Sequence, residues 1–420
     1  MQLDLQNINL FRRKLVLDKN VFFITLALLT YAFFSSSTPD SLGVAEALIA
    51  FSLLALSGSW GYFVISGKAL QHKNILEANL YIVYLIFLYL LYVPLVVGLI
   101  RGNNLVDIIR DIIPFLYLFI IIFFDPFMKK NKKKYLKIFV LLLCIIGISF
   151  SIRHIGSIDN LSTLGKSIIF GDMNYFVMDP AVLFASTFLL NYGYIGLFLE
   201  KGLRKKAISL ILFIAGFVAF LSILGVIVRG QIGLVLFSLF LSTIFIFIKR
   251  PFVISIFIVP IILVFIVVFG EQIANIWSLI VEKTSHTGVL NNRDKEFSAV
   301  MQLLSLSLDN LLFGQGWGGL ITSPVAGTVR FTHFSVTYFL LKTGLVGAIL
   351  FVLFILILFK YLQIIFLNNI FYFSLALAGF NSLIINVFLE AGYKTMSFGL
   401  LVLILILSGE IINESKKTRS

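Results

Sequence analysis

The sequence has one cysteine and few charged residues, and both shortages limit what the protein can be. The cysteine, Cys144, lies in the apolar run LLLCIIG, so a single chain can form neither a disulfide nor a cysteine-based metal site. Of the 420 residues, 13% are charged and 60% are hydrophobic, which excludes a soluble globular domain. A nucleic-acid-binding protein is also excluded, because the basic residues form short islands between apolar runs rather than one basic surface. The composition predicts an integral membrane protein.

The apolar runs predict the number of membrane crossings. A transmembrane helix needs about 20 apolar residues, and basic islands and Gly, Pro and Asn clusters divide the chain into about 12 such spans. No short apolar segment with a small-residue cleavage site opens the chain, so we expect no removable signal peptide. The predicted fold is an all-α polytopic transmembrane bundle in which residues 1–420 form a single membrane domain. The spans are 21–36, 43–66, 75–100, 108–127, 135–152, 179–199, 207–228, 231–248, 252–270, 334–358, 370–389 and 395–412.

The basic residues predict the orientation of this bundle. An even number of spans puts both termini on one side, and 22 of the 33 Lys and Arg residues fall on that side with only 7 of the 20 acidic residues. Because cytoplasmic loops carry the excess of Lys and Arg, both termini should be cytoplasmic. The run KKNKKK is interpreted as part of this topology signal, with affinity for anionic membrane lipids.

Two loops on the outer side are long enough to carry function, residues 153–178 and the larger loop 271–333. In the larger loop, apolar residues recur at helical spacing from Asp294 to Leu312, which predicts one helix, and GQGWGG then ends it with a turn. This turn is not a phosphate-binding loop, because no strand precedes it and no Lys-Ser/Thr pair follows. Trp317 within the turn is interpreted either as an anchor at the lipid headgroups or as a platform on which a sugar stacks.

Two arginines on the outer side are candidate anion-binding residues. Arg229 lies at a tight turn between two apolar spans, where topology requires no charge, and Arg293 begins the predicted loop helix. Each could pair with an outer carboxylate, and Asp294 and Glu296 offer Arg293 such neighbours. The alternative is that their planar guanidinium groups bind a phosphate or diphosphate in a bidentate way.

A histidine at the outer mouth of the bundle is the candidate general base. His333 follows Arg330 by three residues, so both would share one helix face if the tenth span begins slightly early. A lone histidine there is either a hydrogen-bonded interfacial residue or a base that works near neutral pH. Lys342 is the deepest charged residue in the following span. No His-x-x-x-His or similar spacing indicates a metal site.

Three segments, in this order, resemble the bacterial O-antigen polymerases and O-antigen ligases. They are an arginine that opens a span in VRGQIGLVLF, an outer loop with an arginine, a helix and a glycine turn in NNRDKEFSAVMQLLSLSLDNLLFGQGWGG, and a histidine that leads a span in THFSVTYFLLKTGLVGAILF. The resemblance covers residues 222–350 and the overall topology. Phe334 follows the histidine where the ligases commonly have Asn, which favours the polymerase.

The resemblance implies a fold, a reaction and a set of site residues. The fold would be of the GT-C type, with a large, partly helical periplasmic loop between spans 9 and 10, in the bacterial inner membrane. Arg229 and Arg293 would hold the diphosphate of an undecaprenyl-diphosphate-linked oligosaccharide, and His333 would deprotonate the acceptor hydroxyl. The reaction would invert the anomeric centre without a metal or other cofactor. A further set of candidate substrate contacts comprises Arg330, Lys342, Arg153 and Trp317.

The implied function is the polymerisation of O-antigen or a related surface polysaccharide in lipopolysaccharide biosynthesis. The expected partners are membrane lipids and, as a candidate, a protein that regulates chain length, and no nucleic acid is expected. Two alternatives remain. A ligase would transfer the glycan to lipid A core instead. A flippase for lipid-linked oligosaccharides would have similar hydropathy, but its substrate cavity would be reachable from both faces, whereas here the unusual polar residues gather on one face.

Overall fold

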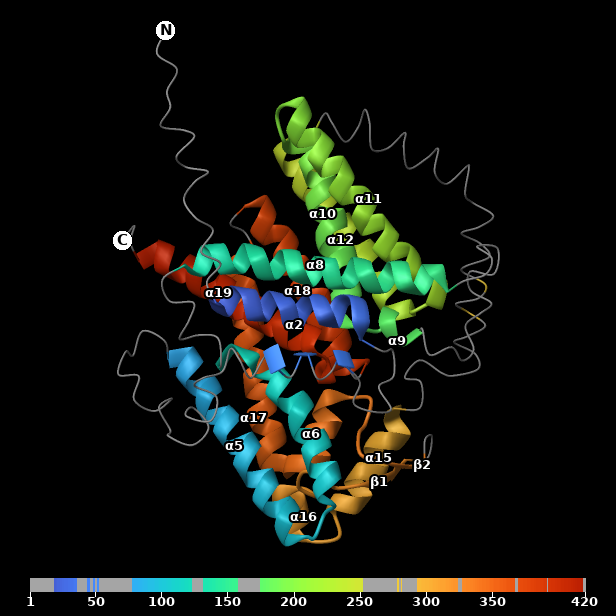
Figure 1. Ribbon diagram of the computed structural model, residues 1–420, viewed down its shortest axis with the longest axis vertical. Helices are drawn as coiled ribbons and strands as arrows, with labels where there is room; N and C mark the ends of the chain where they lie inside the picture. The colour runs from blue at the N-terminus through green and yellow to red at the C-terminus, as the bar shows by residue number, and fades with distance from the viewer. Residues whose placement is uncertain are drawn as a thin grey trace.

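The computed structural model describes residues 19–35, 44–45, 48–49, 51–52, 78–122, 131–157, 174–251, 278, 281, 293–323, 327–366, 369–390 and 392–417, and these residues are almost entirely helical (Figure 1). The main helices and strands are α2 (Lys19–Phe34), α5 (Ala78–Ile100), α6 (Leu105–Leu118), α8 (Lys132–Gly156), α9 (Asn174–Val177), α10 (Pro180–Leu199), α11 (Leu203–Val226), α12 (Arg229–Lys249), α15 (Arg293–Leu304), α16 (Leu308–Phe313), β1 (Ile321–Ser323), β2 (Gly327–Val329), α17 (Ser335–Ile365), α18 (Ile370–Phe388), the 3₁₀ helix η6 (Gly392–Lys394) and α19 (Met396–Lys417).

The described part of the chain has the helices of a multi-pass membrane protein. Eight of them, α5, α8, α10, α11, α12, α17, α18 and α19, are long and apolar enough to cross a membrane. Helices close every backbone hydrogen bond internally, which is the requirement for crossing hydrocarbon. The predicted spans coincide with helices except at 43–66 and 252–270, which lie largely or wholly outside the described residues. The predicted span 108–127 overlaps α6, whose 14 residues are fewer than a full crossing requires.

The bundle has an upper and a lower part in Figure 1, and α2, α8 and α19 lie between them. The upper part contains α10, α11 and α12, and α10 is buried along most of its length against α8, α11 and α18. Close packing there depends on small residues: at Gly193, an added Cβ would lie 2.6 Å from the backbone nitrogen of Phe213 in α11. The lower part contains α5, α6, α15 and α16 together with the first turns of α17.

The glycine turn GQGWGG is docked into the bundle rather than exposed. Gly344 has φ +65° and interrupts the helical geometry of α17, which frees carbonyl groups of the preceding turn. Two of them accept loop hydrogen bonds, from Gln315 N to Leu341 O (2.7 Å) and from Gly316 N to Lys342 O (2.9 Å). Glycine is required at Gly316, because its φ of +75° is unfavourable for other residues and its Cα lies against Gly98 of α5.

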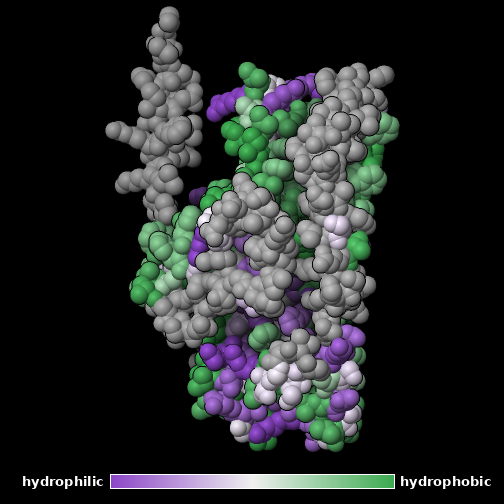
Figure 2. Space-filling model, turned by 90° about the vertical axis from the view of Figure 1, so that its right-hand side faces the viewer, coloured by the Kyte–Doolittle hydropathy of each residue, from purple (hydrophilic) through white to green (hydrophobic). Residues whose placement is uncertain are grey.

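The single helix predicted from Asp294 to Leu312 is wrong, because the segment forms two helices. The chain leaves α15 after Leu304 and enters α16 at Leu308, and the Ser307 side chain caps α16 by accepting a hydrogen bond from Asn310 N (3.1 Å). The short hairpin of β1 and β2 follows, with Ile321 paired to Val329. Figure 2 shows hydrophilic side chains, mixed with hydrophobic ones, at this lower end of the molecule.

Candidate functional site

A histidine and a buried glutamate form the centre of the candidate site. His333 Nδ1 lies 2.8 Å from Glu296 Oε1, and the His333 backbone N–H donates to Glu296 Oε2 (3.2 Å). Burial tends to raise the pKa of Glu296, but the hydrogen bonds from His333 outweigh it, so the net pKa is lowered. An ionised carboxylate can only accept, so Nδ1 carries the proton in the neutral imidazole and Nε2 keeps its lone pair. The His333 side chain is 45% exposed, which leaves the ring accessible.

The amphipathic pattern of α15 explains why Glu296 is buried. Glu296, Val300 and Leu304 follow one another at intervals of four residues and form the buried face of this helix. Phe297 lies on another face and is 45% exposed, although hydropathy alone would have placed it inside. Val300 and Leu304 pack with Ile321 of β1 and Leu341 of α17. The carboxylate is therefore held between α15 and the segment that leads into α17.

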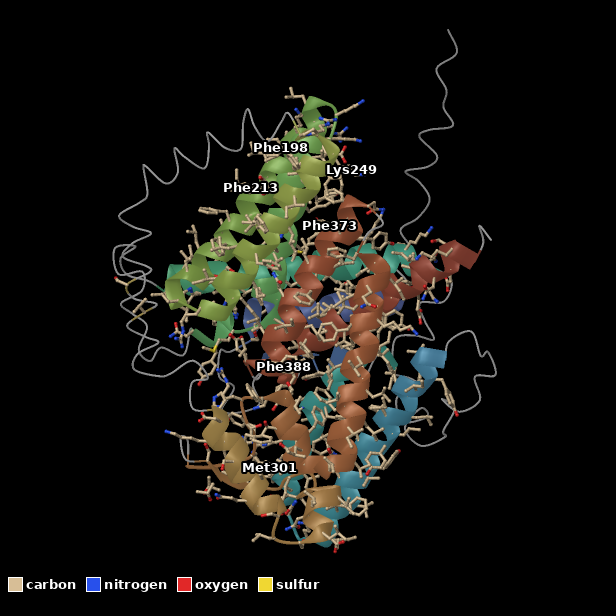
Figure 3. The ribbon with its side chains drawn as sticks, turned by 180° about the vertical axis from the view of Figure 1, so that it is seen from behind. Phe198, Phe213, Lys249, Met301, Phe373 and Phe388 are labelled. Carbon is tan, nitrogen blue, oxygen red and sulfur yellow. The ribbon has the colours of Figure 1, made fainter. Side chains whose placement is uncertain are left out.

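The two arginines predicted to bind an anion come together beside this pair. Arg293 begins α15, and its Nη2 donates a hydrogen bond to the carbonyl of Leu389, just beyond the end of α18. Burial lowers the pKa of Arg293, the charges of Glu390 and Glu296 oppose this, and the charge of Arg229 adds to it. The two guanidinium groups are therefore within electrostatic reach of each other. In Figure 3, Phe388 marks the end of α18 that lies towards α15, whereas Lys249 marks the other end of the bundle.

The local backbone holds Arg229 at a helix start. Ile227 ends α11 in the left-handed conformation (φ +50°), which is rare for a β-branched residue. After this sharp turn, Arg229 is the first residue of α12, where unpaired backbone N–H groups favour an anion. The strained turn is buried, because Ile227 is 2% exposed. Strain of this kind persists only where the surrounding structure fixes it.

A second carboxylate lies in the same cluster. Glu390 follows α18, is 8% exposed and accepts two hydrogen bonds from Gln231 Nε2, both of 3.0 Å. Burial raises its pKa to about 8, against the opposing effects of Gln231 and of the Arg293 charge. We call His333, Glu296, Arg293, Arg229, Gln231 and Glu390 the His333 cluster.

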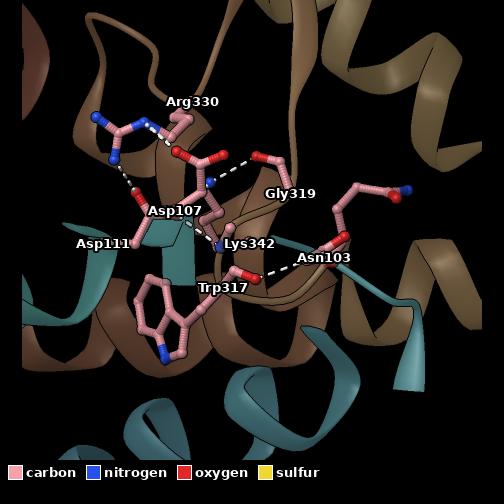
Figure 4. Close-up of polar contacts among 9 residues, drawn as sticks. Asn103, Asp107, Asp111, Trp317, Gly319, Arg330 and Lys342 are labelled. Carbon is pink, nitrogen blue, oxygen red and sulfur yellow. Dashed lines mark hydrogen bonds and ion pairs between the residues drawn. The ribbon is translucent and has the colours of Figure 1, made fainter. Parts of the chain in front are cut away.

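A separate ion network, the Lys342 cluster, consists of Lys342, Asp111, Arg330 and Asp107 (Figure 4). Lys342 Nζ contacts Asp111 Oδ2 and Gly319 O, both at 2.6 Å, and is fully buried. Asp111 also accepts from Gly318 N (2.8 Å) and lies 3.7 Å from Arg330 Nη1. Arg330 Nε is 3.2 Å from Asp107 Oδ1. The network fastens the glycine turn and the Arg330 segment to α6.

The structure corrects two predictions, that Arg330 and His333 share one helix face and that the Trp317 ring is exposed. Arg330 and His333 do not share a helix face, because α17 begins only at Ser335 and the two side chains turn to different carboxylates. Trp317 is fully buried: its Nε1 donates to Leu91 O (3.2 Å), and its ring lies 5.3 Å from that of Phe115. Neither anchoring at the headgroups nor stacking on a sugar is compatible with this burial.

Two further predicted contacts lie apart from the His333 cluster. Lys342 could reach a substrate only if its buried ion pair with Asp111 opened. Arg153 lies at the end of α8, where Nη2 donates to Ser35 O (2.7 Å) and the guanidinium carbon is 4.0 Å from the centre of the Phe176 ring. Its described contacts are thus with α2, α8 and α9, and the structure does not bring it to His333.

The sequence analysis named Glu296 only as a possible partner of Arg293, not of His333, and it did not identify Glu390. The signal for Glu296 was its interval of four residues from Val300, which places it on the buried face of α15. For Glu390 the signal was an acidic residue directly after an apolar span, where a charge is costly unless it is paired. Among the residues that the structure describes, no group of three or more His, Cys, Asp or Glu side chains is arranged to hold a metal ion.

Comparison with known proteins adds no assignment. The sequence matches no protein-family model, and no curated protein matches it. The function must therefore be argued from the residues of the cluster and the chemistry that they permit.

Proposed function

We propose that the chain is an inverting membrane glycosyltransferase, an O-antigen-type polymerase that transfers a growing glycan from polyprenyl diphosphate to a lipid-linked repeat unit. The observation that carries the proposal is the contact of His333 Nδ1 with the buried carboxylate of Glu296, beside two arginines. A carboxylate that holds one imidazole nitrogen prepares the other to accept a proton, which is the arrangement of a general base.

The proposed reaction uses the residues of the His333 cluster in three roles. His333 Nε2 takes the proton of the acceptor hydroxyl while the hydroxyl oxygen attacks the anomeric carbon. The bond from that carbon to the diphosphate oxygen breaks, and the diphosphate leaves with the electron pair. Arg229 and Arg293 stabilise the negative charge that grows on the leaving group. Attack from the face opposite the diphosphate inverts the anomeric centre.

An apolar hollow formed by side chains of α17 is compatible with a lipid-linked donor. It has a volume of about 290 Å³ and is lined by Val336, Leu340, Leu345, Ala348, Ile349 and Val352 of α17. Val336 is only three residues from His333, so prenyl units that lie in this hollow would bring their diphosphate to the arginines. A binding site that is apolar at one end and cationic at the other suits a polyprenyl diphosphate.

The proposal includes a location. The enzyme would lie in the bacterial inner membrane with about 12 spans and both termini in the cytoplasm, and the His333 cluster would face the periplasm. The positive-inside distribution of Lys and Arg supports this orientation.

The test combines cells and purified protein. Cells with His333→Ala, Arg229→Ala or Arg293→Ala should insert the protein and make only single-unit glycans, and the purified variants should not extend a synthetic polyprenyl-diphosphate repeat unit. Asp294→Asn, at an exposed position of α15, is the matched control and should give the normal length ladder. Normal ladders from all three variants would contradict the proposal. Long polymer that stays on the polyprenyl carrier would indicate a ligase instead, and lipid-linked units left on the cytoplasmic side would indicate a flippase.

A further inference from the structure

A buried carboxylate lies beside Arg293 in the proposed donor site. Glu390 directly follows Leu389, whose carbonyl accepts the hydrogen bond from Arg293. Arg293 in turn interacts with Glu390 and with Arg229. When ionised, Glu390 is therefore an internal anion in the field of Arg293, which also lies within electrostatic reach of Arg229. Two anions cannot both be held there at full charge without strong repulsion.

Gln231, the hydrogen-bond partner of Glu390, has a carbonyl oxygen that can still accept a hydrogen bond from a protonated carboxyl group. Gln231 is 1% exposed, and its Nε2 donates to both oxygens of Glu390. Its Oε1 is buried and has no hydrogen-bond partner among the described residues. A carboxylic acid and an amide form two hydrogen bonds, N–H to C=O and O–H to Oε1, whereas a carboxylate can form only the first kind. Protonation of Glu390 would thus satisfy the carbonyl oxygen of Gln231 after a small rotation of the amide.

We infer that Glu390 is a proton-dependent positioning residue of the donor site. Its ionised form lies in the field of Arg293, next to Arg229, and this form takes up one proton from solvent when the donor diphosphate binds. The inference depends on the proposed function, because it assumes a diphosphate ligand. The proton goes to one of the two Glu390 oxygens, both of which lie 3.0 Å from Gln231 Nε2, and it returns to solvent when polyprenyl diphosphate leaves. The pKa of Glu390 is raised to about 8, which agrees with a group whose ionised fraction changes between pH 7 and pH 9.

Other charged or titratable groups surround Glu390 and must be separated from it. On the elements packed around it they are Arg229, Arg293, Glu296, His333, Lys394, Tyr393 and Asp179. The arginines stay protonated near neutral pH, and Glu296, with its lowered pKa, stays ionised. Burial raises the pKa of Asp179 to about 6, so Asp179 is ionised above pH 7. His333 and Lys394 can bind protons themselves, so a variant of Glu390 is needed to assign the proton.

The experiment counts protons by calorimetry on the full-length protein in lipid nanodiscs. The probe is a polyprenyl diphosphate without sugar, titrated at pH 7 and pH 9 in two buffers with different ionisation heats. For a group with a pKa of about 8 in the free protein, linkage predicts uptake of about 0.1 proton at pH 7 and about 0.9 at pH 9. The dissociation constant should weaken about tenfold per pH unit above pH 8. Glu390→Gln keeps the shape and the pairing with Gln231, so it should abolish the rise in uptake and flatten the pH dependence.

Each outcome decides the inference. Wild-type binding without a rise in proton uptake between pH 7 and pH 9 would overturn the inference but not the proposed function. An unchanged rise in Glu390→Gln would also overturn the inference alone, because it would place the proton on His333 or Lys394. Gln231→Met is a second variant, in case Glu390→Gln does not insert. It removes the N–H groups that favour the ionised form, so the rise should move to higher pH, and an unmoved rise would also overturn the inference. No binding by the wild type at either pH would refute the proposed function itself, and this inference with it.

Discussion

Replacement of Glu296 by glutamine should slow glycosyl transfer strongly while it leaves the site almost the same shape. Glu296 accepts hydrogen bonds through two different oxygens, from the His333 ring and from the His333 backbone N–H. An amide has only one acceptor oxygen, so one of these donors loses its partner. If the amide NH₂ group faces the ring, it stabilises the tautomer with the proton on Nε2, and that nitrogen can no longer act as a base.

The expected loss follows from the strength of this contact. The 2.8 Å distance is in the range of a hydrogen bond to a charged group, and such a bond contributes about 1.5–3 kcal/mol. This corresponds to a decrease in kcat of about 10- to 150-fold. A population of the wrong tautomer would increase the loss towards about 10⁴-fold, as for carboxylates that orient a catalytic histidine.

The assay is single-turnover transfer from a synthetic polyprenyl-diphosphate repeat unit, with product length read on a gel and donor affinity measured separately. Glu296→Gln should lower kcat with little change in donor affinity, because the diphosphate is assigned to Arg229 and Arg293. Asp294→Asn removes the same charge from an exposed position of the same helix and should react at the wild-type rate. A Glu296→Gln variant that reacts within twofold of the wild type would refute the assignment of Glu296 as the residue that orients the base.

Three further predictions concern the Lys342 cluster, the glycine turn and pH. Lys342→Met should lower the free energy of unfolding by about 3–5 kcal/mol in a thermal unfolding assay, because it leaves the Asp111 carboxylate buried beside an apolar side chain. The double variant Lys342→Met with Asp111→Asn should recover part of that loss in the same assay. Gly344→Ala should cost at least about 1–2 kcal/mol from its positive φ alone, and because a Cβ there would collide with Leu312 O it should also expose the turn at 314–319 to limited proteolysis. Glu390 binds its proton more tightly in the folded state, where its pKa is about 8, than in the unfolded state, where a glutamate has its ordinary pKa of 4.5. Stability should therefore fall as pH rises from about 4.5 to 8, and Glu390→Gln should flatten that decline in melting temperatures measured across this window.

Hydropathy predicted the helices well because the bilayer leaves the backbone little choice. An apolar run of sufficient length must form a helix to satisfy its own N–H and C=O groups, so α5, α8, α10 and α18 follow directly from composition. The loop region lacks this constraint. There the Ser307 side chain competes for the N–H of Asn310 and ends the predicted helix early. A local polar contact thus decides a boundary that the apolar period does not reveal.

The candidate site was predictable only in part, because its pairs join residues that are far apart in the chain. His333, Arg229 and Arg293 were found from their predicted position on the outer side, and the structure places Arg293 near both Arg229 and the Glu296 partner of His333. Their carboxylate partners could not be paired from one sequence, since Glu296 and His333 are 37 residues apart. The separation of Asp111 and Lys342 is 231 residues. A lone arginine or lysine in a sequence does not show whether a carboxylate neutralises it.

The partners of the outer basic residues determine which of them can bind an anion. Arg330 and Lys342 contact Asp107 and Asp111, which lie one turn apart on α6, so their charges are compensated inside the protein. The hydrogen bond of Arg293 goes instead to a backbone carbonyl, which carries only a partial charge, and its neighbour Glu390 has a pKa of about 8. At pH 7 such a group is only about one-tenth ionised, so it neutralises little of the charge of Arg293 at that pH. A predicted outer face that is almost neutral as a whole can hold a local cationic site, and we propose that this site lies at His333 rather than at Lys342.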